Sequence, residues 1–280
     1  MTDHAMNAGQ VWYGPQAWSY FSIVIGIVMI LIYRWFHVNA LNATRKQLLA
    51  FTFSMTTYFF AMCSPLAYLG HMASFSAHMF QQSLMYMVFP CLFLVGVPSN
   101  WYAHWMKIPS VDRLFRLMTR PLVTVLGFNA LFSFYHFPIV FDTAMSHPIL
   151  HTGYHLLLQV TSFQMWWSML TPIPEQSRLS DLKKIAYIFG NGVILTPACA
   201  LIVFADHVLY NTYSNIDPSL QWLSPMDDQQ LGGVLMKIIQ ELSYGIVLAT
   251  TFFAWHRVER AKDKEEIASI TMVFPNGGEA

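Results

Sequence analysis

The chain has 280 residues, of which 55% are hydrophobic and only 11% are charged. Soluble domains carry about 25% charged residues, so this composition, with a mean hydropathy of +0.41, argues against a soluble domain and indicates a polytopic membrane protein. Basic and acidic residues balance at 15 each, and we expect no nucleic-acid partner. The three cysteines lie apart without a CxxC pair, which argues against a disulfide framework or a thiolate metal site.

Seven apolar runs are long enough to cross a lipid bilayer, which takes about 20 residues. They lie at residues 17–36, 47–69, 75–97, 121–138, 149–170, 185–206 and 231–255. The sequence therefore predicts an all-α fold with one seven-helix, multi-pass membrane domain over residues 17–256. An outer N-terminal segment (1–16) precedes this domain and a cytoplasmic tail (257–280) follows it. The first run is too long for a signal-peptide core, so we expect it to remain as a span.

Basic residues mark one side of the predicted membrane. Because Lys and Arg are enriched in cytoplasmic loops, we predict the N-terminus outside and the C-terminus in the cytoplasm, as an odd number of spans requires. The basic stretch 110–120 mixes arginines with apolar residues, which predicts a short helix in the cytoplasmic interface or, alternatively, a docking surface for a partner. Fourteen of the 15 basic residues fall on the cytoplasmic side: Arg34, Arg45, Lys46, Lys107, Arg113, Arg116, Arg120, Arg178, Lys183, Lys184, Arg257, Arg260, Lys262 and Lys264. The exception is Lys237, which can neutralise Glu241 one turn further along the last span.

Histidines gather at the outer ends of the predicted spans. His78 begins the third span and His136 ends the fourth, while His151 and His155 lie one helical turn apart on one face of the fifth. An imidazole without a partner costs a few kcal/mol in an apolar medium. Each ring could bond backbone, Tyr or Ser groups on its neighbours, but four rings at one depth on three helices favour a metal site.

Further polar residues lie near the same surface as candidates for a supporting role. His71 precedes His78 by seven positions, His207 follows an aspartate at the end of the sixth span, and His147 flanks a helix because Pro148 follows it. Asp142 and Asp228 are candidates to orient the ligand rings. Capping of the last helix explains Asp228 equally well.

The nature of the metal follows from the donor atoms. Imidazole suits copper, zinc and iron, whereas thioether sulfur favours Cu(I), and Met79 lies beside His78. Our hypothesis is Cu(I) in an outward-opening pocket formed by His78, Met79, His136, His151 and His155. The alternatives are a membrane hydrolase with a zinc-bound water and an Asp142 or Asp228 base, a haem held by two of the histidines, and a metal-free scaffold.

Three segments resemble signature segments of one family. They are HMFQQSLMYMVFPCLFLVGVP (78–98), HFPIVFDTAMSHPILHTGYHLLL (136–158) and DQQLGGVLMK (228–237), and they resemble, in order, those of the CtaG family of seven-span assembly factors for haem-copper cytochrome c oxidase. The resemblance implies a non-enzymatic assembly factor in the bacterial plasma membrane that supplies copper to oxidase subunit I, itself loaded by a copper donor.

The resemblance also implies which residues carry the function. The histidine motifs of the family fall on His78, His136, His151 and His155, and its acidic positions fall on Asp142 and Asp228. This chain departs from the pattern at Gln82, where many members have a second histidine, and this removes one potential ligand. It departs again at Lys237, where other members have an aromatic residue.

Overall fold

A computed structural model describes residues 20–36, 43–173, 176–214, 216–217 and 220–273, and these form helices and turns without any strand. The all-α prediction is therefore confirmed for the described part of the chain. The first half contains α2 (Tyr20–Phe36), α3 (Arg45–Cys63), α4 (Pro65–Met72), α5 (Phe75–Ser83), the π-helical turn η3 (Leu84–Val88), α6 (Phe89–Gly96), α7 (Ser99–Trp105) and α8 (Pro109–Met118). The second half contains α9 (Pro121–Tyr135), α10 (Pro138–Ser146), α11 (Pro148–Leu170), α12 (Asp181–Val203), the 3₁₀ turn η5 (Asn211–Tyr213) and α13 (Pro225–Val273).

Proline breaks two of the predicted spans near their outer ends. Proline suits the first turn of a helix, where its missing N–H group has no partner to lose. The predicted span 47–69 is therefore interrupted at Pro65, and α3 and α4 meet at a bend of 45°. The predicted span 121–138 ends early, at Tyr135, because Pro138 starts a separate short helix, α10, where we expected a loop.

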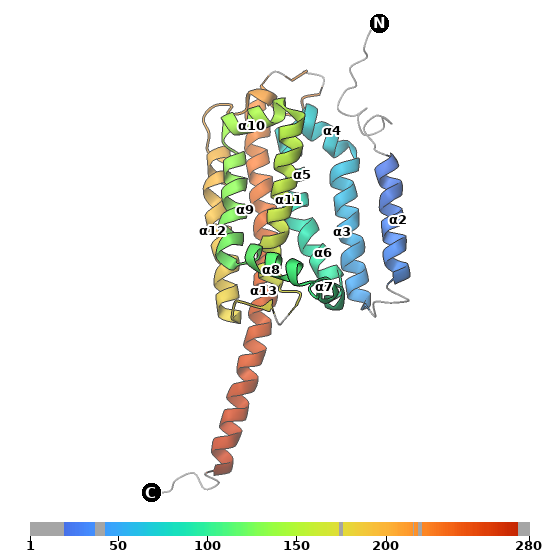
Figure 1. The fold of residues 1–280 in the computed structure, drawn as a ribbon. Helices are drawn as coiled ribbons and strands as arrows, with labels where there is room; N and C mark the ends of the chain where they lie inside the picture. Colours follow the sequence, from blue (N-terminus) through green and yellow to red (C-terminus); the bar gives the residue numbers. More distant parts are fainter. Residues whose placement is uncertain (1–19, 37–42, 174–175, 215, 218–219, 274–280) are drawn as a thin grey trace.

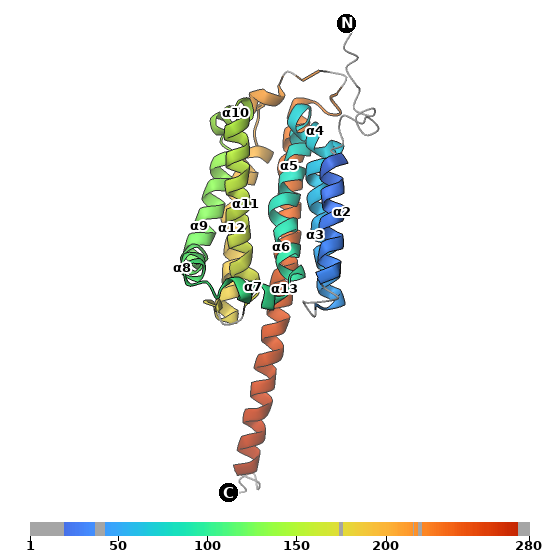
Figure 2. The ribbon, with the colours of Figure 1, turned by 45° about the vertical axis from the view of Figure 1, so that its right-hand side comes forward.

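The long helices run side by side, with α13 between α12 and α5 and with α11 against α9 and α6 (Figures 1 and 2). The helices α4 and α10 lie at one end of the bundle, and α7 and α8 lie at the other (Figure 1). Beyond α7 and α8, α13 continues out of the bundle as far as Val273. The expected boundary between membrane domain and tail at residue 256 thus falls within one continuous helix.

Among the described residues, three helical segments are long and apolar enough to cross a membrane: Phe75–Gly96, Asp181–Val203 and Pro225–Ile267. Two bent pairs, α3 with α4 and α8 with α9, raise this number to five if each pair forms one span. Large apolar side chains also lie exposed on the outside, such as Ile149 and Phe204, which suits contact with lipid. Seven spans and the orientation of the termini stay predictions, and the N-terminal segment 1–16 lies outside the described residues.

Candidate metal centre

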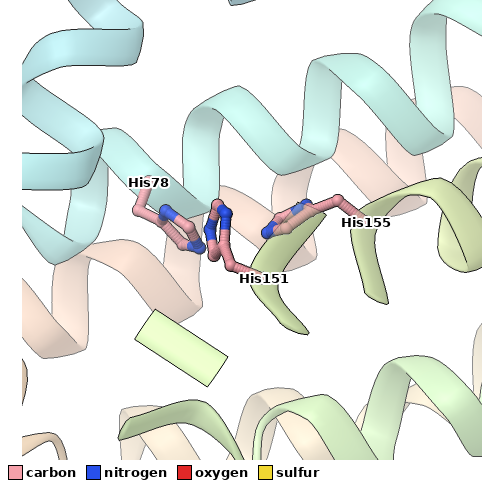
Figure 3. Close-up of side chains that lie close together, drawn as sticks. All are labelled: His78, His151 and His155. Atoms are coloured by element: carbon pink, nitrogen blue, oxygen red, sulfur yellow. The ribbon is translucent and has the colours of Figure 1, made fainter. Parts of the chain in front are cut away.

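Three of the predicted ligands lie together between α5 and α11. His78 on α5 and His151 and His155 on α11 each offer one ring nitrogen, and these three nitrogens lie within 4.8 Å of one another (Figure 3). The ring centroids are 4.2 Å apart for His151 and His155, and 5.8 and 6.1 Å from His78 to His155 and His151. His78 is buried and the other two rings are partly buried. The helical spacing of four residues places the α11 rings on one face, opposite α5.

Two tyrosines and one glutamine hold the rings of His78 and His155 in place. The Tyr135 hydroxyl lies 3.2 Å from Nε2 of His78 and 3.1 Å from Nε2 of His155. The Gln82 amide nitrogen lies 2.7 Å from the same nitrogen of His78, and the Tyr86 hydroxyl lies 2.5 Å from Nδ1 of His155. Nε2 of His151 is buried and has no hydrogen-bond partner among the described residues.

The sequence did not single out Tyr86 or Tyr135, and Gln82 was expected only to remove a potential ligand. Helical spacing could have indicated the role of Gln82, because Gln82 lies four residues after His78 and therefore on the same face of the helix. No sequence pattern indicates Tyr135, which precedes His136 at the end of α9 and approaches the cluster through the tertiary fold.

The π-helical turn η3 places Tyr86. Pro90 has no N–H group to bond the carbonyl of Tyr86 four residues earlier, and its ring disfavours regular helix there. The freed carbonyl accepts hydrogen bonds from Ser162 Oγ (2.5 Å) and Trp166 Nε1 (2.9 Å) of α11. These two hydrogen bonds join η3 to α11 at residues that follow His155 along the helix. They place Tyr86 so that its hydroxyl reaches His155. Single π turns in α-helices are frequent at functional sites.

The other two predicted ligands form a pair of their own. His136 Nδ1 lies 2.7 Å from the carbonyl oxygen of Phe132, and because a carbonyl can only accept, this nitrogen carries the hydrogen. Nε2 of His136 then presents its lone pair to the sulfur of Met79 at 3.3 Å. Both side chains are fully buried. The structure therefore divides the expected ligand set into three imidazoles and an adjacent nitrogen–sulfur pair.

The two predicted acidic residues contact backbone segments rather than imidazole rings. Asp228 accepts hydrogen bonds from the N–H groups of Phe75 and Ser76 at the start of α5, and from the hydroxyls of Ser74 and Ser76. Asp142 accepts bonds from the N–H groups of Asn211 and Thr212 and from the Thr212 hydroxyl. Within the described residues, both carboxylates thus anchor helix starts near the histidines, a role that suits the positive end of a helix.

The three supporting histidines lie further out. The ring of His71 on α4 is exposed and meets the ring of His151 edge to face, with centroids 5.4 Å apart. His147 is exposed, and its Nδ1 lies 3.0 Å from the carbonyl oxygen of Thr143. His207 lies 2.5 Å from the carboxylate of Asp206, and this hydrogen bond lowers the pKa of Asp206. His71 alone of these three contacts a ring of the cluster.

The cluster offers the donor set of a metal site. In tetrahedral coordination with bonds of about 2.0–2.1 Å, ligand nitrogens lie roughly 3.4 Å apart. The three nitrogens therefore need to close by no more than about 1.4 Å, which small rotations of the rings can provide. The unbonded Nε2 of His151 also points to an absent partner, because buried polar atoms are normally hydrogen-bonded.

Comparison with known proteins decides the family. The sequence model of the cytochrome c oxidase caa3 assembly factor family (Caa3_CtaG) matches residues 29–258, most of the chain. The chain belongs to this family. No curated protein and no solved structure matches it. The Caa3_CtaG match includes the three histidines, both tyrosines and the nitrogen–sulfur pair.

The segment DQQLGG at the start of α13 has a structural role in this Caa3_CtaG chain. Asp228 caps α5, and the Gln229 side chain accepts a hydrogen bond from the N–H of Leu209 at 2.7 Å. A Cβ atom on Gly232 would lie 2.6 Å from the ring of Phe75 and 3.0 Å from the side chain of Met79. This glycine therefore permits close packing of α13 against α5, next to the nitrogen–sulfur pair.

The expected ion pair within α13 is confirmed. Lys237 Nζ lies 2.6 Å from Oε1 of Glu241 and 2.8 Å from the Thr196 hydroxyl on α12. The Gln240 side chain donates to the carbonyl oxygen of Gly192 at 3.2 Å. These contacts join α12 to α13.

Proposed function

We propose that this assembly factor binds Cu(I) with His78, His151 and His155 and delivers it to cytochrome c oxidase. The observation that carries the proposal is the approach of one ring nitrogen from each of three imidazoles between α5 and α11. The buried Nε2 of His151, which has no hydrogen-bond partner among the described residues, supports it. Copper is the cargo of the protein in this proposal. The family match supports the oxidase as the client, and we propose its subunit I as the acceptor.

The donor atoms favour Cu(I) over harder metals. Three neutral imidazoles and one thioether suit a soft monovalent ion, and the pair of Met79 and His136 is adjacent to the cluster. Tyr135, Gln82 and Tyr86 keep the rings of His78 and His155 oriented while no metal is bound. Metal binding at Nε2 of His78 or His155 replaces their hydrogen bonds to Tyr135.

Release follows from the same chemistry. Neutral ligands need no reprotonation when the metal leaves, so copper exchange does not depend on a proton donor. The cluster lies toward the bundle end that contains α4 and α10, which is the outer end in the predicted topology. We propose that copper enters from a donor and leaves toward the oxidase on that side of the plasma membrane.

Titration of the detergent-solubilised full chain with Cu(I) against a competing chelator tests the proposal. The wild type is expected to bind copper at a fixed stoichiometry, and the double variant His151→Ala, His155→Ala is expected to lose that binding. The variant His207→Ala removes an exposed histidine that is hydrogen-bonded to Asp206, and it serves as the matched control. Unchanged copper stoichiometry in a folded double variant would refute the site.

Metal analysis of the isolated protein separates the alternatives. Zinc in place of copper would favour the hydrolase, although the structure engages both candidate bases, Asp142 and Asp228, in helix capping. A Soret absorption band would favour haem. An oxidase defect that follows gene deletion but not histidine replacement would favour a metal-free scaffold.

A further inference from the structure

A second candidate site lies at the opposite end of the bundle, on α8. A hollow of about 730 Å³ is lined by Arg113 and Arg116 of α8, by Arg120 just before α9 and by Arg178 of the α11–α12 connection. Asp112 is the acidic residue in the described lining, so four positive charges face one negative charge. The volume is within the range of small-ligand pockets. The metal centre uses none of these residues.

Specific contacts form the hollow. One carboxylate oxygen of Asp112 accepts a hydrogen bond from Nε of Arg116 at 2.7 Å. The other accepts one from the side chain of Gln176 at 3.2 Å, two residues before Arg178. Asp112 therefore ties α8 to the connection and brings Arg178 to the α8 arginines. Because the Asp112 carboxylate pairs with Arg116, the other three arginines of the described lining have no acidic partner there. These are Arg113, Arg120 and Arg178.

The remaining faces of α8 show what kind of surface surrounds the hollow. At 100° per residue, Arg113 and Arg116 of α8 fall in a sector of about 60°, and Leu114, Leu117 and Met118 fall in the next sector. Arg120 follows the end of α8, as the N-cap of α9. The Phe115 ring packs on Trp167, with centroids 4.6 Å apart, and faces the bundle. Leu114 and Leu117 are 59% and 52% exposed. An exposed apolar sector beside arginines is typical of a helix in a membrane interface.

We propose that this hollow binds the phosphate headgroup of an anionic phospholipid, with the acyl chains along the leucine face of α8. Arginine forks bind phosphate oxygens through paired hydrogen bonds. The exposed indole groups of Trp101 and Trp105 on neighbouring α7 suit the same interfacial depth. A free anion needs no apolar surface next to the arginines, whereas a lipid joins its phosphate to hydrocarbon. The site thus anchors α8 and the N-terminal end of α9 in the membrane.

Native mass spectrometry of the detergent-solubilised full chain tests the proposal with added phosphatidylglycerol, phosphatidylcholine, inorganic phosphate or a glutamate-rich peptide. We expect phosphatidylglycerol to bind about tenfold more tightly than phosphatidylcholine. The triple variant Arg113→Gln, Arg120→Gln, Arg178→Gln is expected to lose this preference. It keeps Arg116 and hence the bond to Asp112. The matched control Arg257→Gln, Arg260→Gln, Lys264→Gln removes three positive charges from α13 and is expected to keep the preference.

Several results would overturn the lipid site. These are an unchanged preference in the triple variant, an equal loss in the control, displacement of the lipid by inorganic phosphate, and tighter binding of the acidic peptide than of the lipid. The last result would assign the hollow to a protein partner. If the triple variant does not fold, Arg178→Gln and Arg178→Lys replace it. Arg178 lies in a connection, and the lysine variant is expected to retain part of the preference that the glutamine variant loses.

Discussion

The Tyr86 hydroxyl lies 2.5 Å from Nδ1 of His155, although the two residues are 69 positions apart in the chain. The contact depends on the π turn η3, which Pro90 favours between α5 and α6. It fixes the orientation of one imidazole of the proposed copper site from outside the ligand set.

Replacement of Tyr86 by Phe removes this hydrogen bond and keeps the ring. Loss of an outer partner of a metal-bound histidine typically weakens metal affinity about 10–100-fold. We expect a loss in this range for Tyr86→Phe in the Cu(I) titration, with unchanged stoichiometry. The control Tyr187→Phe removes the hydroxyl that contacts Thr124, and full affinity is expected there. Equal affinities in the two variants would show that Tyr86 does not orient the site.

The variant Gly70→Ala tests the close packing of α4 on α5. A Cβ atom at this position would lie 3.0 Å from both Cα and N of His78, and the backbone cannot rotate away as a side chain can. Overpacking of this kind costs about 1–3 kcal/mol. We expect a lower thermal unfolding temperature in detergent and a weaker copper site. Gly127→Ala on α9 meets nothing within 4 Å, so its stability is expected to stay the same or rise.

The adjacent residues Asp227 and Asp228 are expected to respond differently to the same substitution. Asp228→Asn places an amide group against N–H donors of α5 and disrupts a charged cap, which costs about 1–3 kcal/mol. Asp227 is exposed and bonds only Ser224 of its own turn among the described contacts, so Asp227→Asn is expected to cost about 0.5 kcal/mol or less. Thermal unfolding of both variants checks this. Equal losses would contradict the capping of α5 by Asp228.

The ion pair of Lys237 and Glu241 gives a test of compensation between α12 and α13. Lys237→Met leaves the Glu241 carboxylate without its cation within an apolar helix, and we expect lower stability. The double variant Lys237→Met, Glu241→Leu removes both charges and is expected to recover most of the loss. Thermal unfolding in detergent measures both. A double variant that is less stable than the single one would show that Glu241 has a partner other than Lys237.

Part of this protein follows from its sequence alone. The apolar run 149–170 predicted α11 (Pro148–Leu170) to within about one residue at each end. A segment in lipid must form all of its backbone hydrogen bonds internally, so an apolar run of this length forms a helix. The spacing of His151 and His155 places both rings on one face for the same local reason. The pair of Lys237 and Glu241 is also a local contact, one turn apart, and the sequence predicted it correctly.

Other features depend on how distant helices meet. The sequence placed His136 with the other histidines, yet in the folded chain it faces Met79, while its neighbour Tyr135 reaches His78 and His155. Asp142 and Asp228 were candidates to orient the rings, with capping as the alternative for Asp228, and in the folded chain both accept hydrogen bonds from backbone N–H groups at helix starts. Local periodicity determines which side of a helix a residue occupies. Only the packing of the helices determines which atoms of another helix it meets, because those atoms come from chain segments tens of residues away.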